Sequence, residues 1–190
     1  MKPSDIPFNM NFSFGDDLRE VPEDSEQMRK GLDWLQDKIV ELAADEGSKA
    51  GVILSQIGGY ARIMGDLSLS EKCYLDAIKV FEELKKSEQV FAMKLRLAIV
   101  FQYKGNFTKS SEIYTKCIEL TRTSKSSAVQ SYLDFALHHF GKQKFEQGFY
   151  SEALDLFMEA YELRIIKGDL SLISSTELAV NKTKEKLEQS

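Results

Sequence analysis

The sequence predicts an all-α fold of about eight helices, stacked as consecutive helical hairpins. All three prolines lie in the first 22 of the 190 residues, so the rest of the chain lacks the residue that most strongly interrupts a helix. Large apolar, small and glycine residues also recur three times at a spacing of about 40 residues, which is typical of a helical repeat protein. Hydrophobic residues make up 43% of the chain, enough for a folded core.

Three glycines mark the repeat, at positions 65, 105 and 148. A large apolar residue and then a small one stand eight and seven residues before each glycine: Ile57-Gly58, Leu97-Ala98 and Phe140-Gly141. An aromatic and a small residue follow at nine and twelve residues: Tyr74 and Ala77, Tyr114 and Cys117, Phe157 and Ala160. The small residues would let paired helices approach closely, and the aromatic rings would fill the space between them.

Each copy predicts two helices joined at its glycine. The glycine supplies the backbone freedom of a tight reversal. A hydroxyl residue three positions later (Ser68, Thr108, Ser151) suits the N-cap of the second helix. The predicted hairpins cover residues 48–86, 87–123 and 125–167.

Two flanking helices complete the predicted array. Residues 25–46 form an amphipathic N-terminal helix that carries the single tryptophan, Trp34. Residues 170–188 follow Gly168 and form a C-terminal capping helix whose charged side chains suit a wet outer face.

Residues 1–24 form an extended N-terminal arm in this prediction. Its apolar residues alternate with polar ones, the period of a strand: Ile6, Phe8, Met10, Phe12 and Phe14. Three alternatives stay open: a flexible tail, an arm packed on its own body, and a segment that pairs with another chain or blocks the groove. The number of large apolar side chains favours docking.

The repeat resembles the tetratricopeptide repeat (TPR) in its long-period form, over roughly residues 48–166. The chain departs from the family pattern at Ser70, Ser110, Cys117 and Lys144, and no copy has the closing proline. The resemblance implies a right-handed α-α superhelix, or solenoid, whose first helices line a concave groove. It implies a non-catalytic protein that binds a protein or peptide, as an adaptor or regulator.

The repeat register of that family places twelve residues in or beside the groove. They are Ser55, Gln56, Gly59, Arg62, Arg96, Ile99, Gln102, Tyr103, His138, His139, Lys142 and Phe145. This set is more basic than the chain, whose net charge is −5, so an acidic partner is favoured. The family's carboxylate clamp for chaperone tails is absent, because Ser55, Gly59 and Arg96 replace its Lys and Asn residues.

Other classes of function find no support in the sequence. The acidic net charge argues against nucleic acid, and no apolar stretch suits a membrane span or signal peptide. Cys73 and Cys117 fit a reducing, cytoplasmic location as buried residues. His138 and His139 lack the spacing of a metal site, and no motif indicates catalysis or a cofactor.

Two other functions remain as alternatives. One is an inhibitor or immunity-type protein that covers a folded partner. The other is a self-assembling structural subunit, in which residues 6–14 are exchanged between chains; the chain would otherwise be a monomer.

Overall fold

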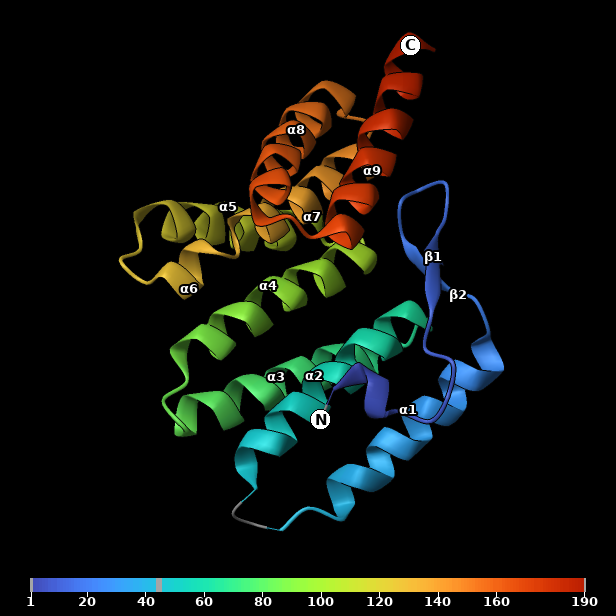
Figure 1. The fold of residues 1–190 in the computed structure, drawn as a ribbon, viewed down its shortest axis with the longest axis vertical. Coiled ribbons are helices and arrows are strands. Elements are labelled where there is room, and N and C mark those ends of the chain that lie inside the picture. Colours follow the sequence, from blue (N-terminus) through green and yellow to red (C-terminus); the bar gives the residue numbers. More distant parts are fainter. Residues whose placement is uncertain (1, 44–45, 190) are drawn as a thin grey trace. The chain divides into compact units, whose positions relative to one another are not determined.

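The computed structural model describes residues 2–43 and 46–189, and it confirms the all-α prediction (Figure 1). Eight of its helices have 14 residues or more within these ranges, and a ninth has four. The chain divides into two compact units, one ending at Asn106 and one beginning at Phe107. No helix in the described ranges has the length and apolar character to cross a membrane.

The first unit contains a short N-terminal arm and four long helices. The arm has the 3₁₀ helix η1 (Pro3–Asp5) and the strands β1 (Phe12–Phe14) and β2 (Glu20–Pro22). The helices are α1 (Ser25–Val40), α2 (Gly47–Ile63), α3 (Leu67–Glu83) and α4 (Ser87–Tyr103). Each helix packs on the next one along the chain.

The second unit consists of helices alone within its described residues. They are α5 (Phe107–Thr123), α6 (Ser127–Gln130), α7 (Leu133–Glu146), α8 (Tyr150–Lys167) and α9 (Leu170–Glu188). Helix α7 packs on both α5 and α8, and α8 packs on α9. The predicted hairpin 87–123 is divided between the units, because α4 ends the first and α5 begins the second.

Close approach of paired helices depends on the predicted small residues. A Cβ added at Gly58 of α2 would come to 3.0 Å from the ring of Tyr74 of α3. The Tyr74 ring is almost fully buried. Ser70, where the family pattern expects Ala, donates its hydroxyl to the Gly58 carbonyl oxygen at 2.6 Å. The hydroxyl therefore adds a hydrogen bond at the contact and leaves the approach of the helices intact.

The helix turns need glycine for its backbone angles. Gly65 has φ +82° and Gly148 has φ +80°, and an added Cβ would meet nothing at either site. The predicted N-cap at Ser68 is wrong: Asp66 caps α3 by accepting from the Leu69 amide at 2.9 Å. Helix α3 begins at Leu67, one residue after Asp66, so Ser68 already lies inside its first turn.

Two predicted helix boundaries are also corrected. The helix predicted over 25–46 ends at Val40, and the Glu46 carboxylate accepts from the Ala43 amide at 3.1 Å; residues 44 and 45 lie outside the described ranges. The hairpin predicted from residue 125 starts with the short α6, and α7 begins only at Leu133. Serine side chains in this segment bond to nearby backbone, as between Ser131 and the Ala128 carbonyl, which competes with helix formation.

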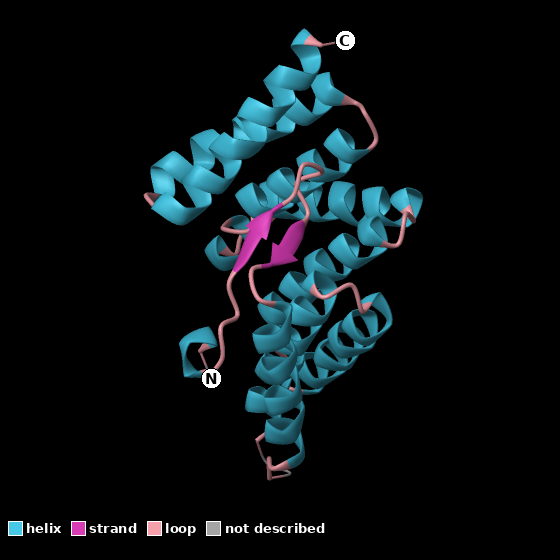
Figure 2. Cartoon of the chain, turned by 90° about the vertical axis from the view of Figure 1, so that its right-hand side faces the viewer, coloured by secondary structure: helices cyan, strands magenta, loops and turns pink. Residues whose placement is uncertain are grey.

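The arm folds back on itself and docks on its own unit. Strands β1 and β2 form an antiparallel hairpin in which Phe12 lies opposite Pro22 (Figure 2). Before the hairpin, Ile6 is buried in a core cluster with Leu32 and Leu35 of α1. The flexible-tail alternative is therefore not what the structure shows.

Candidate functional site: a buried carboxylate on the predicted inner face

The twelve predicted groove residues do not form an open surface. Five are half-buried: Ser55, Gln56, Gly59, Arg96 and Tyr103. Seven are buried: Arg62, Ile99, Gln102, His138, His139, Lys142 and Phe145. The first eight along the chain belong to the first unit and the last four to the second.

In the first unit, the arm places a carboxylate against two of these residues. The Glu20 carboxylate of β2 accepts from Arg62 Nη1 of α2 at 2.6 Å. It also accepts from the hydroxyl of Tyr103, the last residue of α4. The same hydroxyl accepts from the Glu20 amide at 3.1 Å. Both the carboxylate and the backbone of one arm residue are thus held by predicted groove residues.

The Glu20–Arg62 ion pair is shielded from water. The side chains of Glu20 and Arg62 are 7% and 9% exposed, and burial at this level strengthens a charge-assisted hydrogen bond. Burial alone would lower the pKa of Arg62, but the Glu20 carboxylate together with Tyr103 and Tyr74 outweighs it, and the pKa lies above its usual value. The Arg62 guanidinium therefore stays charged beside the Glu20 carboxylate.

The Tyr103 ring lies close to two guanidinium groups. Arg19 Cζ is 4.5 Å from the ring centroid and Arg62 Cζ is 4.8 Å from it, within the range of cation–π attraction. Burial raises the pKa of the Tyr103 hydroxyl, so this group remains a donor to the Glu20 carboxylate. The ring therefore links the hairpin to helices α2 and α4.

Two polar atoms on this face are buried without a hydrogen-bond partner in the described residues: Arg62 Nε and Gln56 Oε1. A buried polar group without a partner costs about 1–3 kcal/mol. In its bond to Glu20, the Arg62 guanidinium donates through Nη1, and its Nε makes no hydrogen bond to the described residues.

The arm also borders an open cavity of about 800 Å³. Its lining includes Phe8, Met10 and Phe12 from the arm and Tyr60 from α2. The one acidic or basic residue in this lining, within the described residues, is Glu23. This cavity offers apolar and neutral polar contacts and no cluster for acid–base chemistry.

In the second unit, the predicted histidines are packing residues. His138 Nδ1 lies 3.3 Å from the Thr176 hydroxyl of α9, and the His138 ring lies 5.6 Å from that of Phe157. His139 packs on the Phe135 ring at 4.3 Å. The described residues contain no group of three or more potential metal ligands.

The main polar feature of this unit is an ion pair that was not predicted from the sequence. Arg164 of α8, 1% exposed, donates from Nε to Asp134 of α7 at 3.1 Å. Its Nη1 also reaches the carbonyl of Leu172 and the hydroxyl of Thr176 on α9. Burial lowers the pKa of Arg164, and the Asp134 carboxylate opposes that shift. This network fastens the C-terminal helix to the hairpin before it.

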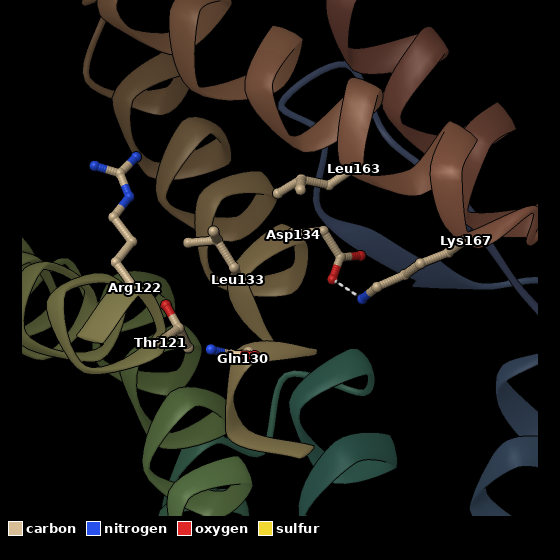
Figure 3. Close-up of a pocket in the computed structure, with 7 residues that line it drawn as sticks. All are labelled: Thr121, Arg122, Gln130, Leu133, Asp134, Leu163 and Lys167. Carbon is tan, nitrogen blue, oxygen red and sulfur yellow. Dashed lines mark hydrogen bonds and ion pairs between the residues drawn. The ribbon is translucent and has the colours of Figure 1, made fainter. Parts of the chain in front are cut away.

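A pocket of about 370 Å³ lies beside that network (Figure 3). Lys167 points into it and pairs with the Asp134 carboxylate. Arg122, also on the lining, pairs with Glu159 at 2.6 Å. Since both cations already have carboxylate partners, the pocket is not a ready anion site.

The alignment of the repeat copies could have indicated the buried pair of Arg164 and Asp134. Its equivalent in the first copy is Phe81, and the equivalent of Asp134 is Gly51. A Cβ at Gly51 would come to 2.6 Å from the Phe81 ring, so these two first-copy residues also touch. An arginine and an aspartate at two positions that meet inside the repeat predict a buried ion pair. No comparable signal marks Glu20, which lies outside the repeats.

No family model matches the chain, and no curated protein matches it. Among solved structures, it is similar to the crystal structure of BtubC (BKLC) from P. vanneervenii, with a TM-score of 0.45 and 17% sequence identity. That match covers 86% of this chain and 72% of the other. A likeness at this level assigns neither a repeat family nor a function.

Proposed function

We propose that this chain is a non-catalytic protein of the TPR type that binds a peptide or protein partner, as an adaptor or regulator. The inner face of its first unit would be the binding surface. The observation that carries the proposal is the seating of Glu20, because an extended segment is held through its carboxylate by Arg62 and Tyr103. The repeat register had assigned both residues to a peptide groove.

The chemistry of this contact suits recognition of an acidic peptide. A guanidinium and a phenol hydroxyl both donate to one carboxylate, and charge-assisted bonds of this kind contribute about 1.5–3 kcal/mol each. Tyr103 also accepts from the backbone amide beside that carboxylate. Backbone and side-chain contacts together favour an extended acidic segment over an isolated anion.

The docked arm favours this function over exchange between chains. Ile6 is 6% exposed within its own unit, and Gly31 of α1 leaves room for Met10. We therefore expect a monomer of 21.6 kDa in light scattering after size exclusion. A dimer that becomes monomeric without residues 6–14 would support the structural-subunit alternative.

A cytoplasmic location is part of the proposal. Cys73 and Cys117 are both buried and neither forms a disulfide, which suits a reducing compartment.

The test is selection of binding peptides against the full-length chain from a library of random 12-residue segments. Arg96 lies half-buried on the proposed face, and Lys94 is exposed on the same helix two residues earlier. We expect the selected peptides to be rich in Asp and Glu. Arg96→Glu should then weaken their binding at least about tenfold, the effect of one lost charge-assisted contact.

Lys94→Glu is the matched control, because it makes the same change of charge on α4 away from that face. We expect it to alter the dissociation constant less than about twofold, as a screened surface charge would. Equal weakening by both variants, or selected peptides without acidic residues, would contradict the proposed surface. Circular dichroism of each variant checks that the helices are retained.

A further inference from the structure

We infer that the N-terminal arm is a ligand of its own chain: Glu20 occupies the carboxylate site of the first unit, and an extended acidic segment of a partner protein displaces it. The inference rests on the proposed function and adds both the ligand class and a mechanism of control. It follows from where the arm is attached, how it is strained and how it engages Arg62.

The arm is attached at two separate places. Ile6 and Met10 pack against α1 around Gly31, where a Cβ would come to 2.2 Å from the Met10 sulfur. Ten residues after Met10, Glu20 makes the polar contact with Arg62 and Tyr103. The second attachment can open while the first keeps the arm tethered, so the displaced segment stays nearby and can return.

The turn beside Glu20 holds backbone strain. Leu18 has φ +62°, in the left-handed region that a residue with a branched side chain rarely adopts. Its amide donates to the Gly15 carbonyl at 3.1 Å, which maintains the turn, and the side chain is 1% exposed. Opening the turn releases this strain, which offsets part of the cost of exposing the buried Leu18 side chain when Glu20 is freed.

The arm does not use Arg62 fully. Its carboxylate meets Nη1, while the buried Nε has no hydrogen-bond partner among the described residues. Arginine binds a carboxylate best through two parallel N–H···O bonds. A partner segment whose glutamate or aspartate reaches Nε and a terminal nitrogen together makes one more bond than Glu20 does. That additional bond allows an external peptide to compete with the tethered arm, and a peptide with the arm's own sequence can also make it because the folded turn at Leu18 does not fix its position.

The chemistry of Glu20 defines the class of ligand. The occupant is an acidic side chain within an extended segment, whose amide is also held by Tyr103. The partner is therefore a protein with an exposed, extended acidic stretch.

The experiment measures binding of a fluorescent peptide with the sequence of residues 11–24 to the full-length chain. Glu20→Gln in the chain keeps the shape of the arm and removes the charge that competes for Arg62. We expect this variant to bind the peptide at least about tenfold more tightly than the unchanged chain. The same peptide carrying Glu20→Gln should lose that gain, and so should a chain that combines Glu20→Gln with Tyr103→Phe.

A second measurement needs no variant of the chain. Hydrogen–deuterium exchange of the unchanged protein should accelerate over residues 18–22 when the acidic peptide is added in excess, and not when the Glu20→Gln peptide is added. Residues 25–40 of α1 should exchange as before, since the arm is released only near Glu20.

Equal affinity of the unchanged chain and its Glu20→Gln variant for the acidic peptide, or unchanged exchange over residues 18–22, would overturn the inference. If Arg96→Glu still weakens the binding of the selected peptides in that case, the proposed binding function stands. Only the inference that Glu20 occupies the site is then wrong. If Arg96→Glu has no effect either, both are wrong.

Discussion

Gly141 of α7 lies against the ring of Phe157 of α8, so closely that a Cβ on Gly141 would stand 2.7 Å from a ring carbon. Phe157 is fully buried and cannot move without displacing its neighbours. We predict that Gly141→Ala lowers the free energy of unfolding by about 1–2 kcal/mol, because overpacking exceeds the gain in helix propensity. Urea unfolding followed by circular dichroism measures the change.

Gly59→Ala is the control for that prediction. A Cβ at Gly59 would lie 3.4 Å from the Tyr74 hydroxyl oxygen, an ordinary contact distance. The substitution should leave stability unchanged or raise it by up to about 1 kcal/mol, since alanine favours the helix. Equal destabilisation by both substitutions would mean that close helix packing is not what requires the glycine.

The Arg164–Asp134 pair predicts a strong asymmetry between single and double substitutions. Arg164→Met leaves the Asp134 carboxylate buried with Lys167 as its remaining cation, and should destabilise the protein by about 3 kcal/mol. Combining it with Asp134→Leu removes the unbalanced charge and should restore at least about 1 kcal/mol. Denaturant unfolding of the single and double variants tests this.

Arg122→Met provides the matched comparison, because Arg122 pairs with Glu159 on the surface. The side chains of this pair are 52% and 41% exposed, so its loss should cost less than about 1 kcal/mol. A cost as large as that of Arg164→Met would show that burial is not the deciding factor.

Cys73 predicts a loss of stability in alkali. Burial raises the pKa of this thiol from 9.0 to about 11. Below pH 9 the thiol is protonated in both the folded and unfolded states. As the pH rises from 9 to 11 the unfolded chain loses the proton first, so the free energy of unfolding falls, by on the order of 2 kcal/mol.

Replacing Cys73 isolates the contribution of its thiol to the pH dependence of the free energy of unfolding. Cys73→Ala should show a smaller decrease in unfolding free energy between pH 9 and 11 than the unchanged chain. Tyr74 and Tyr103, whose pKa values burial also raises, remain in both proteins and cancel in the comparison. Identical pH profiles would refute the assignment to Cys73.

Docking of the arm on α1 depends on the absence of a side chain at Gly31. Gly31→Leu should push Met10 out of its place and increase hydrogen–deuterium exchange over residues 6–14, while the helical circular dichroism is retained. Gly31→Ala should have a smaller effect, because the tip of Met10 can move aside. An arm equally protected in the leucine variant would show that its docking does not use this contact.

The helices and their close contacts could be predicted because their signals are local and repeated. The spacing of Gly58, Gly141 and their aromatic partners is visible along the chain, and the structure places each glycine against its ring. Helix ends were harder, because Asp66 competes with Ser68 for the same cap and both residues suit it.

The polar contacts of the site could not be predicted in the same way. Glu20 and Arg62 are 42 residues apart and share no periodic pattern, so only the folded arm brings them together. The alternation of Ile6 to Phe14 predicted a strand-like segment, of which only Phe12–Phe14 forms a strand, and it did not indicate that the partner strand would come from residues 20–22. Arg62 was assigned to an open groove, and the arm instead covers it.

The position of Glu20 has a practical consequence for anyone who shortens this protein. A fragment that starts at α1 would retain all of the repeated helices. Such a fragment would retain the Arg62 cation without the counter-ion that neutralises it. The fragment would therefore bind other molecules nonspecifically and be less stable. Affinities measured with it would be those of a protein with an exposed Arg62 and not those of the intact chain.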